Sequence, residues 1–460
     1  MMKIAVLAAL LSPARAAIDG ALVAKLKPTV VNIERSWTVG LNSEGSGRGR
    51  ASGFIVDAAR GIIATNHHVA GSGPSLFKIV FANGQSTDAR LLHYDPWHDF
   101  AFLKVEPGRL GFPLREAALG DSFALREQDD VVMIGNNDVH EYSVKFGKVS
   151  NLVLEKGVRH SAAIQTTFDR AGGSSGSPVF DSRGRAVALH FAGTETTSFE
   201  LKIDYLKDAL VRLQAGAPVR RGDAGLELGL ILVSDARKHF RLPEALARRV
   251  LALRPGLKYM ISVGSRVPGT PASDKLLPGD QILSVDGAWV GDDLYRFDRI
   301  VDGKVGGEVE VRAVRAGEEL TVRLPVRDAE ALKATRFARF AGGVLQELTP
   351  ELRLRHDLRS DGVFLSAAET GSSMSFLGRG RNERYLIVIE GVNGRPTPDL
   401  DAFIAATRGL RDREHAYFIV QDKNETKTDI KAVPVTLDLR YSPLEVWEWS
   451  PQKLDWVKTP

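Results

Sequence analysis

Short apolar runs separated by turn residues dominate the first half of the chain. Between about residues 28 and 205 these runs end repeatedly at Gly, Asn or Asp. Strands of this kind at regular spacing are typical of β-barrels and sandwiches rather than of alternating β–α–β units. The pattern therefore predicts mostly β structure, with strands near 30–33, 53–56, 61–64, 78–81, 101–105, 131–135, 178–180 and 186–189.

The periodicity changes after this β-rich region. Residues 203–213 have apolar positions at helical spacing, and the Gly-, Pro- and Arg-containing stretch 216–225 is typical of a linker. Farther on, two strand patterns end in a tight-turn dipeptide, Asp286-Gly287 and Asn393-Gly394, as in two copies of one small module. We therefore expect a β-rich domain at 17–216, two small α+β units at 222–327 and 336–438, and a tail at 439–460.

The tail contains Trp447, Trp449 and Trp456. We expect these tryptophans to pack against the third unit, and a partner-binding aromatic patch is the alternative.

Composition and charge exclude several classes of protein. The chain has no cysteine, so disulfides, thiol nucleophiles and cysteine metal sites are excluded. A formal net charge of +4, without a basic stripe interleaved with aromatics, argues against nucleic acid as a partner. Residues 1–16 combine Lys3, a short apolar run and Ala14-Arg15-Ala16, which predicts a cleaved signal peptide, export, and no membrane segment afterwards. We expect no metal and no cofactor.

Three segments carry residues suited to nucleophilic catalysis. His68 follows a strand, where an imidazole can act as a general base. Asp99 enters a strongly apolar strand, and a buried carboxylate there needs a partner such as an imidazole N–H. Ser175 lies among glycines, which permit a sharp turn with inward-pointing amides. Alone, each has an ordinary structural interpretation: a structural histidine, a turn cap and a polar loop.

Together the three segments are far more specific. Their order along the chain, His, Asp, Ser, is the chymotrypsin-like order and differs from the subtilisin and α/β-hydrolase orders. The order predicts Ser175 as nucleophile, His68 as general base and Asp99 as the group that orients the imidazole. The amides of Gly173 and Ser175 would form the oxyanion hole.

Several stretches resemble the HtrA/Deg family of trypsin-like serine proteases. These are 53–56 with 65–69 around His68, 95–103 around Asp99, 164–178 around Ser175, and the PDZ-like run 278–287. The resemblance implies a mostly β, chymotrypsin-like double β-barrel followed by two α+β PDZ-like domains. It also selects His68 over His67, and Ser175 over its serine neighbours. In motif style the chain is closer to one half of the tandem HtrA-like protease of the fungal nucleus.

The resemblance further implies an endopeptidase for unfolded polypeptides, with PDZ-like units that capture peptide C-termini, in a homotrimer. Following the signal peptide, we expect it in a bacterial periplasm. Two alternatives stay open: a protease-like chaperone or scaffold with a latent triad, and a processing protease with one dedicated substrate.

Substrate contacts are expected at two places. Asp169 precedes Ser175 by six residues, the place where basic-specific digestive relatives have an acidic residue at the base of the specificity pocket. By this resemblance Asp169 would favour Lys or Arg, unless Arg170 neutralises it. His190, Phe191 and Ala192 are expected to line the cleft as an edge strand that pairs with an extended peptide, and a plain core strand is the alternative.

Overall fold

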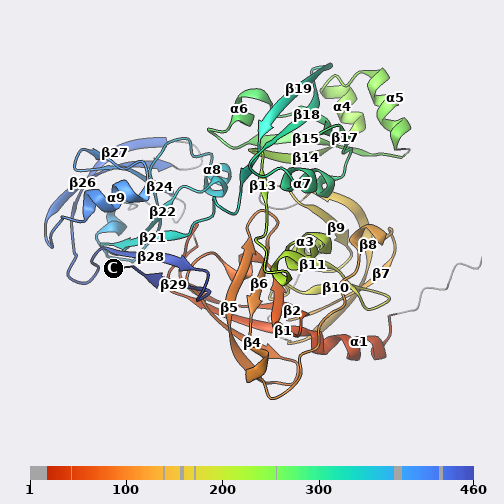
Figure 1. The fold of residues 1–460 in the computed structure, drawn as a ribbon, viewed down its shortest axis with the longest axis horizontal. Helices are drawn as coiled ribbons and strands as arrows, with labels where there is room; N and C mark the ends of the chain where they lie inside the picture. The colour runs from red at the N-terminus through yellow and green to blue at the C-terminus, as the bar shows by residue number, and fades with distance from the viewer. Residues whose placement is uncertain are drawn as a thin grey trace, which may run out of the picture.

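The fold begins with two β-barrels, shown in the lower part of the ribbon in Figure 1. In this computed structural model the described residues are 18–42, 44–137, 140–155, 160–169, 172–254, 256–377, 386–423 and 428–459. The predicted signal peptide at 1–16 lies outside them. After helix α1 (Gly20–Leu26), the first barrel closes in the order β1-β2-β3-β6-β5-β4. Its strands are β1 (Val30–Trp37), β2 (Gly47–Asp57), β3 (Ile62–Thr65), β4 (Leu76–Phe81), β5 (Ser86–Asp95) and β6 (Phe100–Lys104).

The second barrel closes in the order β10-β11-β12-β9-β8-β7 and is followed by helix α3 (Ile203–Gln214). The sequence pattern predicts this helix at 203–213. The strands are β7 (Asp130–Gly135), β8 (Ser143–Glu155), β9 (Ala162–Thr166), β10 (Pro178–Asp181), β11 (Ala186–Gly193) and β12 (Ser198–Lys202). The chain is therefore mostly β with a chymotrypsin-like double barrel, as predicted.

Both faces of β3, β6 and β10 are buried, and the two faces of each strand belong to different cores. Along β6, Ala101 and Leu103 point into a cluster that fills the first barrel, whereas Phe100 and Phe102 belong to a cluster shared with the second barrel. Side chains alternate between the two faces of a strand, so one strand can supply both cores. The segments that carry His68, Asp99 and Ser175 adjoin the ends of these strands.

A middle unit follows, in which helices lie around one sheet, at the top of the ribbon in Figure 1. Its sheet has the order β14-β15-β16-β18-β19, with β17 beside β16. A separate two-stranded pair, β13 with β20, joins the linker to the segment that ends the unit. The strands are β13 (Gly222–Asp223), β14 (Leu226–Leu232), β15 (Tyr259–Arg266), β16 (Gln281–Val285), β17 (Ala288–Trp289), β18 (Glu308–Arg315), β19 (Glu318–Pro325) and β20 (Arg327–Asp328). The helices are α4 (Val233–His239), α5 (Glu244–Leu253), α6 (Pro271–Lys275) and α7 (Leu294–Asp302).

The C-terminal unit is built on a sheet of order β27-β26-β24-β23-β22-β21-β28-β29, with β25 beside β24. The strands are β21 (Arg336–Phe340), β22 (Gly343–Glu347), β23 (Val363–Ala368), β24 (Leu386–Val392), β25 (Arg395–Pro396), β26 (His415–Lys423), β27 (Thr428–Thr436), β28 (Glu445–Ser450) and β29 (Asp455–Lys458). Its helices are α8 (Pro350–His356) and α9 (Leu400–Thr407). Asp399 caps α9 by accepting a hydrogen bond from the Ala402 amide.

The predicted tail is part of this sheet rather than a separate segment. Strand β28 pairs with β21, and Trp447 stacks on Phe337 with ring centroids 6.1 Å apart. Trp456 is also buried against Phe337. The hairpin β28-β29 reaches the first barrel, where Asp455 pairs with Arg90 at 2.5 Å.

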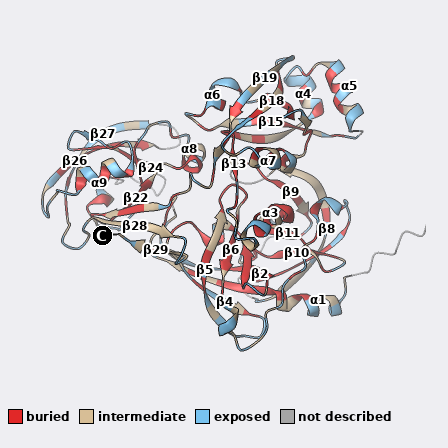
Figure 2. Cartoon of the chain, viewed as in Figure 1, coloured by how far each residue is buried: buried red, intermediate tan, exposed pale blue. Residues whose placement is uncertain are grey.

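The three parts are joined by polar contacts as well as by packing. The backbone amide of Asn42 donates to Gln346 Oε1 at 2.7 Å, which ties the first barrel to the C-terminal unit. In Figure 2 buried residues follow the barrel strands, while the outer strand β27 and helix α6 are largely exposed. Within the described ranges, every helix is too short or too polar to cross a bilayer.

Candidate active site

The predicted catalytic residues lie in connections next to barrel strands, and the connection that carries Ser175 contacts β2 of the first barrel. His68 lies in the short helix α2 (His67–Ala70) that follows β3, and Asp99 directly precedes β6. Because β3 pairs with β6, with Thr65 opposite Ala101, the two connections emerge side by side. Ser175 lies between β9 and β10 of the second barrel.

His68 and Asp99 form a direct, doubly hydrogen-bonded pair. The Asp99 Oδ2 lies 2.7 Å from His68 Nδ1, and Oδ1 accepts from the His68 backbone amide at 2.8 Å. Desolvation lowers the pKa of His68, but the charge of Asp99 and its hydrogen bond together outweigh it, so the pKa is raised from its usual value. The pair thus fixes one tautomer, with the proton on Nδ1 and Nε2 left as the basic nitrogen.

Asp99 is held in an uncommon backbone conformation. Its φ is +54°, in the left-handed region that Asp tolerates better than most residues. The Asn66 side-chain amide donates to the Asp99 carbonyl at 2.9 Å and so links the Asp segment to the His segment. The carboxylate is aimed at His68 by the backbone, not only by its own rotamer.

His67 has different neighbours, which agrees with the choice of His68. Its Nε2 lies 2.9 Å from Ser72 Oγ, and its ring stacks on Tyr94 with centroids 5.1 Å apart. Burial lowers the pKa of His67 to about 4, so the ring is neutral at ordinary pH. A structural role fits this histidine.

The turn that contains Ser175 has two positions with a backbone conformation that favours glycine. Gly173 and Gly176 have φ values of +81° and +84°. A Cβ on Gly176 would lie 2.0 Å from the Ser52 carbonyl oxygen, so any larger residue would clash with β2. The Gly176 amide donates to the His190 carbonyl at 3.0 Å, which anchors the turn to β11.

Ser52 is a member of this site that the sequence analysis did not identify. Its amide donates to the Ser175 carbonyl at 2.8 Å, and its hydroxyl donates to the Gly173 carbonyl at 3.0 Å. The Ser52 carbonyl in turn accepts from Thr65 Oγ1 at 2.8 Å, three residues before His68. The Asn136 amide donates to Ser52 Oγ at 2.7 Å. Ser52 therefore couples the Ser segment to the His segment across the two barrels.

The signal for Ser52 was weak in the sequence. It stands one residue before the run 53–56 that resembles the protease family, but a serine beside an apolar strand has many ordinary roles.

The predicted substrate residues have partners that change their interpretation. Asp169 is 71% exposed and accepts from Lys145 Nζ at 2.7 Å, and this hydrogen bond lowers its pKa. The cation that neutralises Asp169 here is Lys145; Arg170 lies outside the described residues. A carboxylate that is exposed and already paired with a lysine is poorly suited to bind a basic substrate side chain at the bottom of a specificity pocket. Recognition of Lys or Arg by Asp169 remains an untested prediction.

His190 is buried rather than directed into open space. Its Nδ1 lies 3.0 Å from Glu200 Oε2 and 2.9 Å from Ser198 Oγ, and Glu200 Oε1 accepts from Thr166 at 2.8 Å. Its backbone still belongs to the site, because its amide donates to the Ser177 carbonyl at 2.9 Å. Phe191 and Ala192 are half-buried, on a part of β11 that extends beyond the start of β10 at Pro178.

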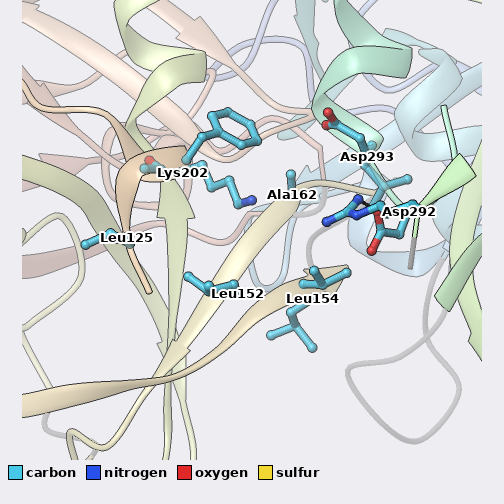
Figure 3. Close-up of a pocket in the computed structure, with 12 residues that line it drawn as sticks. Leu125, Leu152, Leu154, Ala162, Lys202, Asp292 and Asp293 are labelled. Atoms are coloured by element: carbon cyan, nitrogen blue, oxygen red, sulfur yellow. Dashed lines mark hydrogen bonds and ion pairs between the residues drawn. The ribbon is translucent and has the colours of Figure 1, made fainter. Parts of the chain in front are cut away.

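A pocket of about 150 Å³ lies elsewhere, between the second barrel and the middle unit. Figure 3 shows Lys202 projecting into it from the barrel, with Asp292 and Asp293 on the opposite side. Asp292 pairs with Arg254, and the Lys202 ammonium lies 4.3 Å from the centre of the Phe123 ring. The charges of its lining balance, and His68, Asp99 and Ser175 are not among its lining residues. The pocket is therefore not the active site.

Comparison with known proteins assigns both kinds of domain. Residues 51–189 match the trypsin-like peptidase domain family, and residues 331–413 match the PDZ-like domain family. The PDZ-like match falls on the C-terminal unit, although the more recognisable PDZ motif in the sequence was that of the middle unit.

Several curated relatives are fungal proteins. The pro-apoptotic serine protease NMA111 of Vanderwaltozyma polyspora is 29% identical over 402 residues, covering 85% of this chain and 40% of that protein. NMA111 of Chaetomium globosum is 31% identical over 404 residues, with 85% and 38% covered. This chain thus spans about 40% of the length of these relatives. Among solved structures, the HtrA-type protease AlgW with a tripeptide has a TM-score of 0.49 at 24% identity, covering 66% of this chain and 95% of that chain.

The predicted localisation is wrong. Export to a bacterial periplasm rested on the N-terminal 16 residues, whereas the matching curated relatives are fungal proteins. The chain therefore contains a trypsin-like peptidase domain and a PDZ-like domain, and over most of its length it is similar to the fungal serine proteases named NMA111.

Proposed function

We propose that this chain is a serine endopeptidase in which Ser175 is the nucleophile, His68 the general base and Asp99 the residue that orients His68. The observation that carries the proposal is the double hydrogen bond between His68 and Asp99, and the turn that contains Ser175, with Gly173 and Gly176 at positive φ, supports it. The relatives named as serine proteases support the same reaction class.

The proposed reaction uses the His68–Asp99 pair as its general base. His68 Nε2 takes the proton of Ser175 Oγ as that oxygen attacks the scissile carbonyl, and the imidazolium is stabilised by Asp99. His68 then returns the proton to the leaving amine, which yields an acyl-enzyme on Ser175. Water, activated by the same histidine, hydrolyses the ester and restores the serine. The amides of Gly173 and Ser175 would stabilise the oxyanion in both steps.

The substrate proposed is an unfolded polypeptide in extended conformation. Half-buried residues at the end of β11, Phe191 and Ala192, offer a strand end beside the Ser175 turn. A peptide bound there by strand addition would place its carbonyl near the nucleophile. Capture of peptide ends by the PDZ-like domain, assembly into a trimer and a role in protein quality control belong to the same proposal.

Labelling with a fluorophosphonate and digestion of casein test the proposal. Wild type should react with the probe and cleave casein, and Ser175→Ala should do neither. His67→Ala provides a control for His68→Ala, because the neighbouring ring makes its contacts with Ser72 and Tyr94. Failure of wild type to react or cleave, with aggregation of casein still suppressed, would instead indicate a chaperone with a latent triad. Light scattering of the purified chain checks the trimer.

A further inference from the structure

A lysine is buried between the second barrel and the middle unit without an ion-pair partner. Lys202 ends β12 and is 8% exposed, and its side chain points into the pocket of about 150 Å³ shown in Figure 3. Within the described part of the chain, its ammonium group makes no hydrogen bond and no ion pair. The contact that it does make is with the face of the Phe123 ring, whose centre is 4.3 Å away.

The acids whose charges act on Lys202 are engaged with other groups. Burial lowers the pKa of Lys202 against the charges of Asp293, Asp204 and Asp292, which raise it. A buried ammonium without a hydrogen-bonded counter-charge is costly. Each of the three acids has a different partner: Asp292 pairs with Arg254, Asp293 accepts from the Arg296 amide at 3.0 Å, and Asp204 accepts from Lys207 at 3.1 Å. The pocket therefore holds an unused donor for a negatively charged group.

The wall of the pocket beside Lys202 is mostly apolar. Leu125, Leu152, Leu154 and Ala162 line it together with the lysine, as Figure 3 shows. A cavity of roughly 150 Å³ can bind a molecule of the size of benzene. The apolar part of such a ligand would contact these side chains while one charged group reaches the ammonium.

The opposite side of the pocket limits the charge that a ligand can carry. Asp292 and Asp293 lie there, across from Lys202 (Figure 3). A doubly charged phosphate would bring its second charge toward these carboxylates and would be repelled. A carboxylate has a single charge and accepts a strong hydrogen bond from an ammonium group.

We propose that this pocket binds a small aliphatic monocarboxylate, with Lys202 Nζ donating to the carboxylate and the apolar wall covering the hydrocarbon part. The bound molecule would contact the second barrel and the middle unit together. The site differs from strand addition by a peptide, because side chains hold the ligand. It includes none of His68, Asp99 and Ser175, so the inference does not depend on the proposed function.

Isothermal titration calorimetry of the full-length chain with 4-methylpentanoate tests the site. The neutral 4-methylpentanamide has nearly the same shape and is the matched ligand. Wild type should bind the acid at least about tenfold more tightly than the amide, since a hydrogen bond to a charged group contributes about that factor. N-acetylleucine carries the same carboxylate at a peptide-like end. Binding of both acids would assign the site to carboxylate ends in general, and binding of 4-methylpentanoate alone would assign it to free acids.

Three variants complete the test. Lys202→Met keeps the length of the side chain without its charge, and should bind the acid at least about tenfold more weakly with the amide unchanged. Lys148→Met removes a lysine of the same barrel that pairs with Asp130 at 2.6 Å, and should match wild type. If Lys202→Met does not fold, Leu154→Trp, which fills the pocket from the half-buried end of β8, should abolish binding of both ligands.

Two results would overturn the inference. One is equal binding of the acid to wild type and to a folded Lys202→Met or Leu154→Trp. The other is a wild type that binds no acid or does not distinguish it from the amide. None of these measurements uses peptide cleavage or labelling of Ser175, so a failure of the proposed function would leave their outcome unchanged.

Discussion

The carboxylate of Asp99 meets His68 at two points, the ring Nδ1 at 2.7 Å and the backbone amide at 2.8 Å. Because the second contact is to the backbone of α2, the carboxylate is fixed relative to that helix and not only relative to the His68 ring. The tautomer of His68 is therefore set before substrate arrives.

Replacement of Asp99 by Asn should remove most of the activity while leaving the fold intact. The amide can still accept from the His68 backbone, but an amide facing Nδ1 favours the wrong tautomer. A loss of kcat of about 10⁴-fold is expected for this change in a triad. Steady-state kinetics with a peptide substrate measure the loss, and a thermal unfolding curve close to that of wild type excludes unfolding as its cause.

The pH profile of the wild-type enzyme should have its acid limb above the pKa of an ordinary histidine, about 6.5. Asp99 raises the pKa of His68, so the ring stays protonated to a higher pH than usual and cannot act as a base there. Activity should therefore be low at pH values below this raised pKa and should increase as the pH rises through it. The profile of kcat/KM gives the midpoint, and His67→Ala should leave it in place. A midpoint below 6.5 would contradict the prediction.

Gly176 should tolerate no side chain. An alanine there would carry two costs: the left-handed φ of +84°, and a Cβ 2.0 Å from the Ser52 carbonyl oxygen. Gly84 offers a matched control, because its φ is +79° and a Cβ added there would have no atom within 4 Å. Gly84→Ala should cost about 1–2 kcal/mol in the free energy of unfolding. Gly176→Ala should cost roughly 1–3 kcal/mol more and abolish labelling of Ser175. Denaturant unfolding compares the two, and equal costs would contradict the clash.

Ser52→Ala should impair catalysis although Ser52 touches no substrate in the proposed mechanism. Its hydroxyl links the Gly173 carbonyl to the buried Asn136 amide, and alanine leaves both backbone groups without this partner. Loss of such a bond costs about 1–3 kcal/mol. We expect lower stability and slower labelling of Ser175, measured by denaturant unfolding and by fluorophosphonate kinetics. Ser75→Ala, on a half-buried serine that bonds Arg35, serves as a control for serine loss elsewhere.

Residues that lie in a distinctive local motif could be predicted, and residues without such a motif could not. His68, Asp99 and Ser175 each lie in a short motif whose local chemistry is distinctive. Ser52 and Lys202 lack such a motif. Lys202 shares its pocket with Asp292, which comes much later in the chain, and the two meet only because the middle unit packs against the second barrel. Packing between distant segments decides such contacts, and the local pattern contains no signal for it.

The same limit applies to the organisation of the C-terminal unit. Helix α3 was predicted almost to the residue, because its apolar spacing is a local property. The pairing of the tail with β21 cannot be predicted, because Trp447 pairs with Phe337, 110 positions earlier, and strand pairing at that distance leaves no periodic pattern in the sequence. The tryptophans suggested packing, but not that Trp447 and Trp456 would meet at Phe337.

Asp169 should have little influence on the residue preferred before the cut site. Its carboxylate is mostly exposed and is held by Lys145, so it presents little net charge to a substrate side chain. We expect Asp169→Ala and wild type to give the same cut sites in casein, as mapped by mass spectrometry. Lys145→Met tests the reason directly, because it removes the cation and leaves the carboxylate. If Asp169 faces the specificity pocket after all, that variant should gain cleavage after Lys and Arg, and Lys145→Met combined with Asp169→Ala should lose it again.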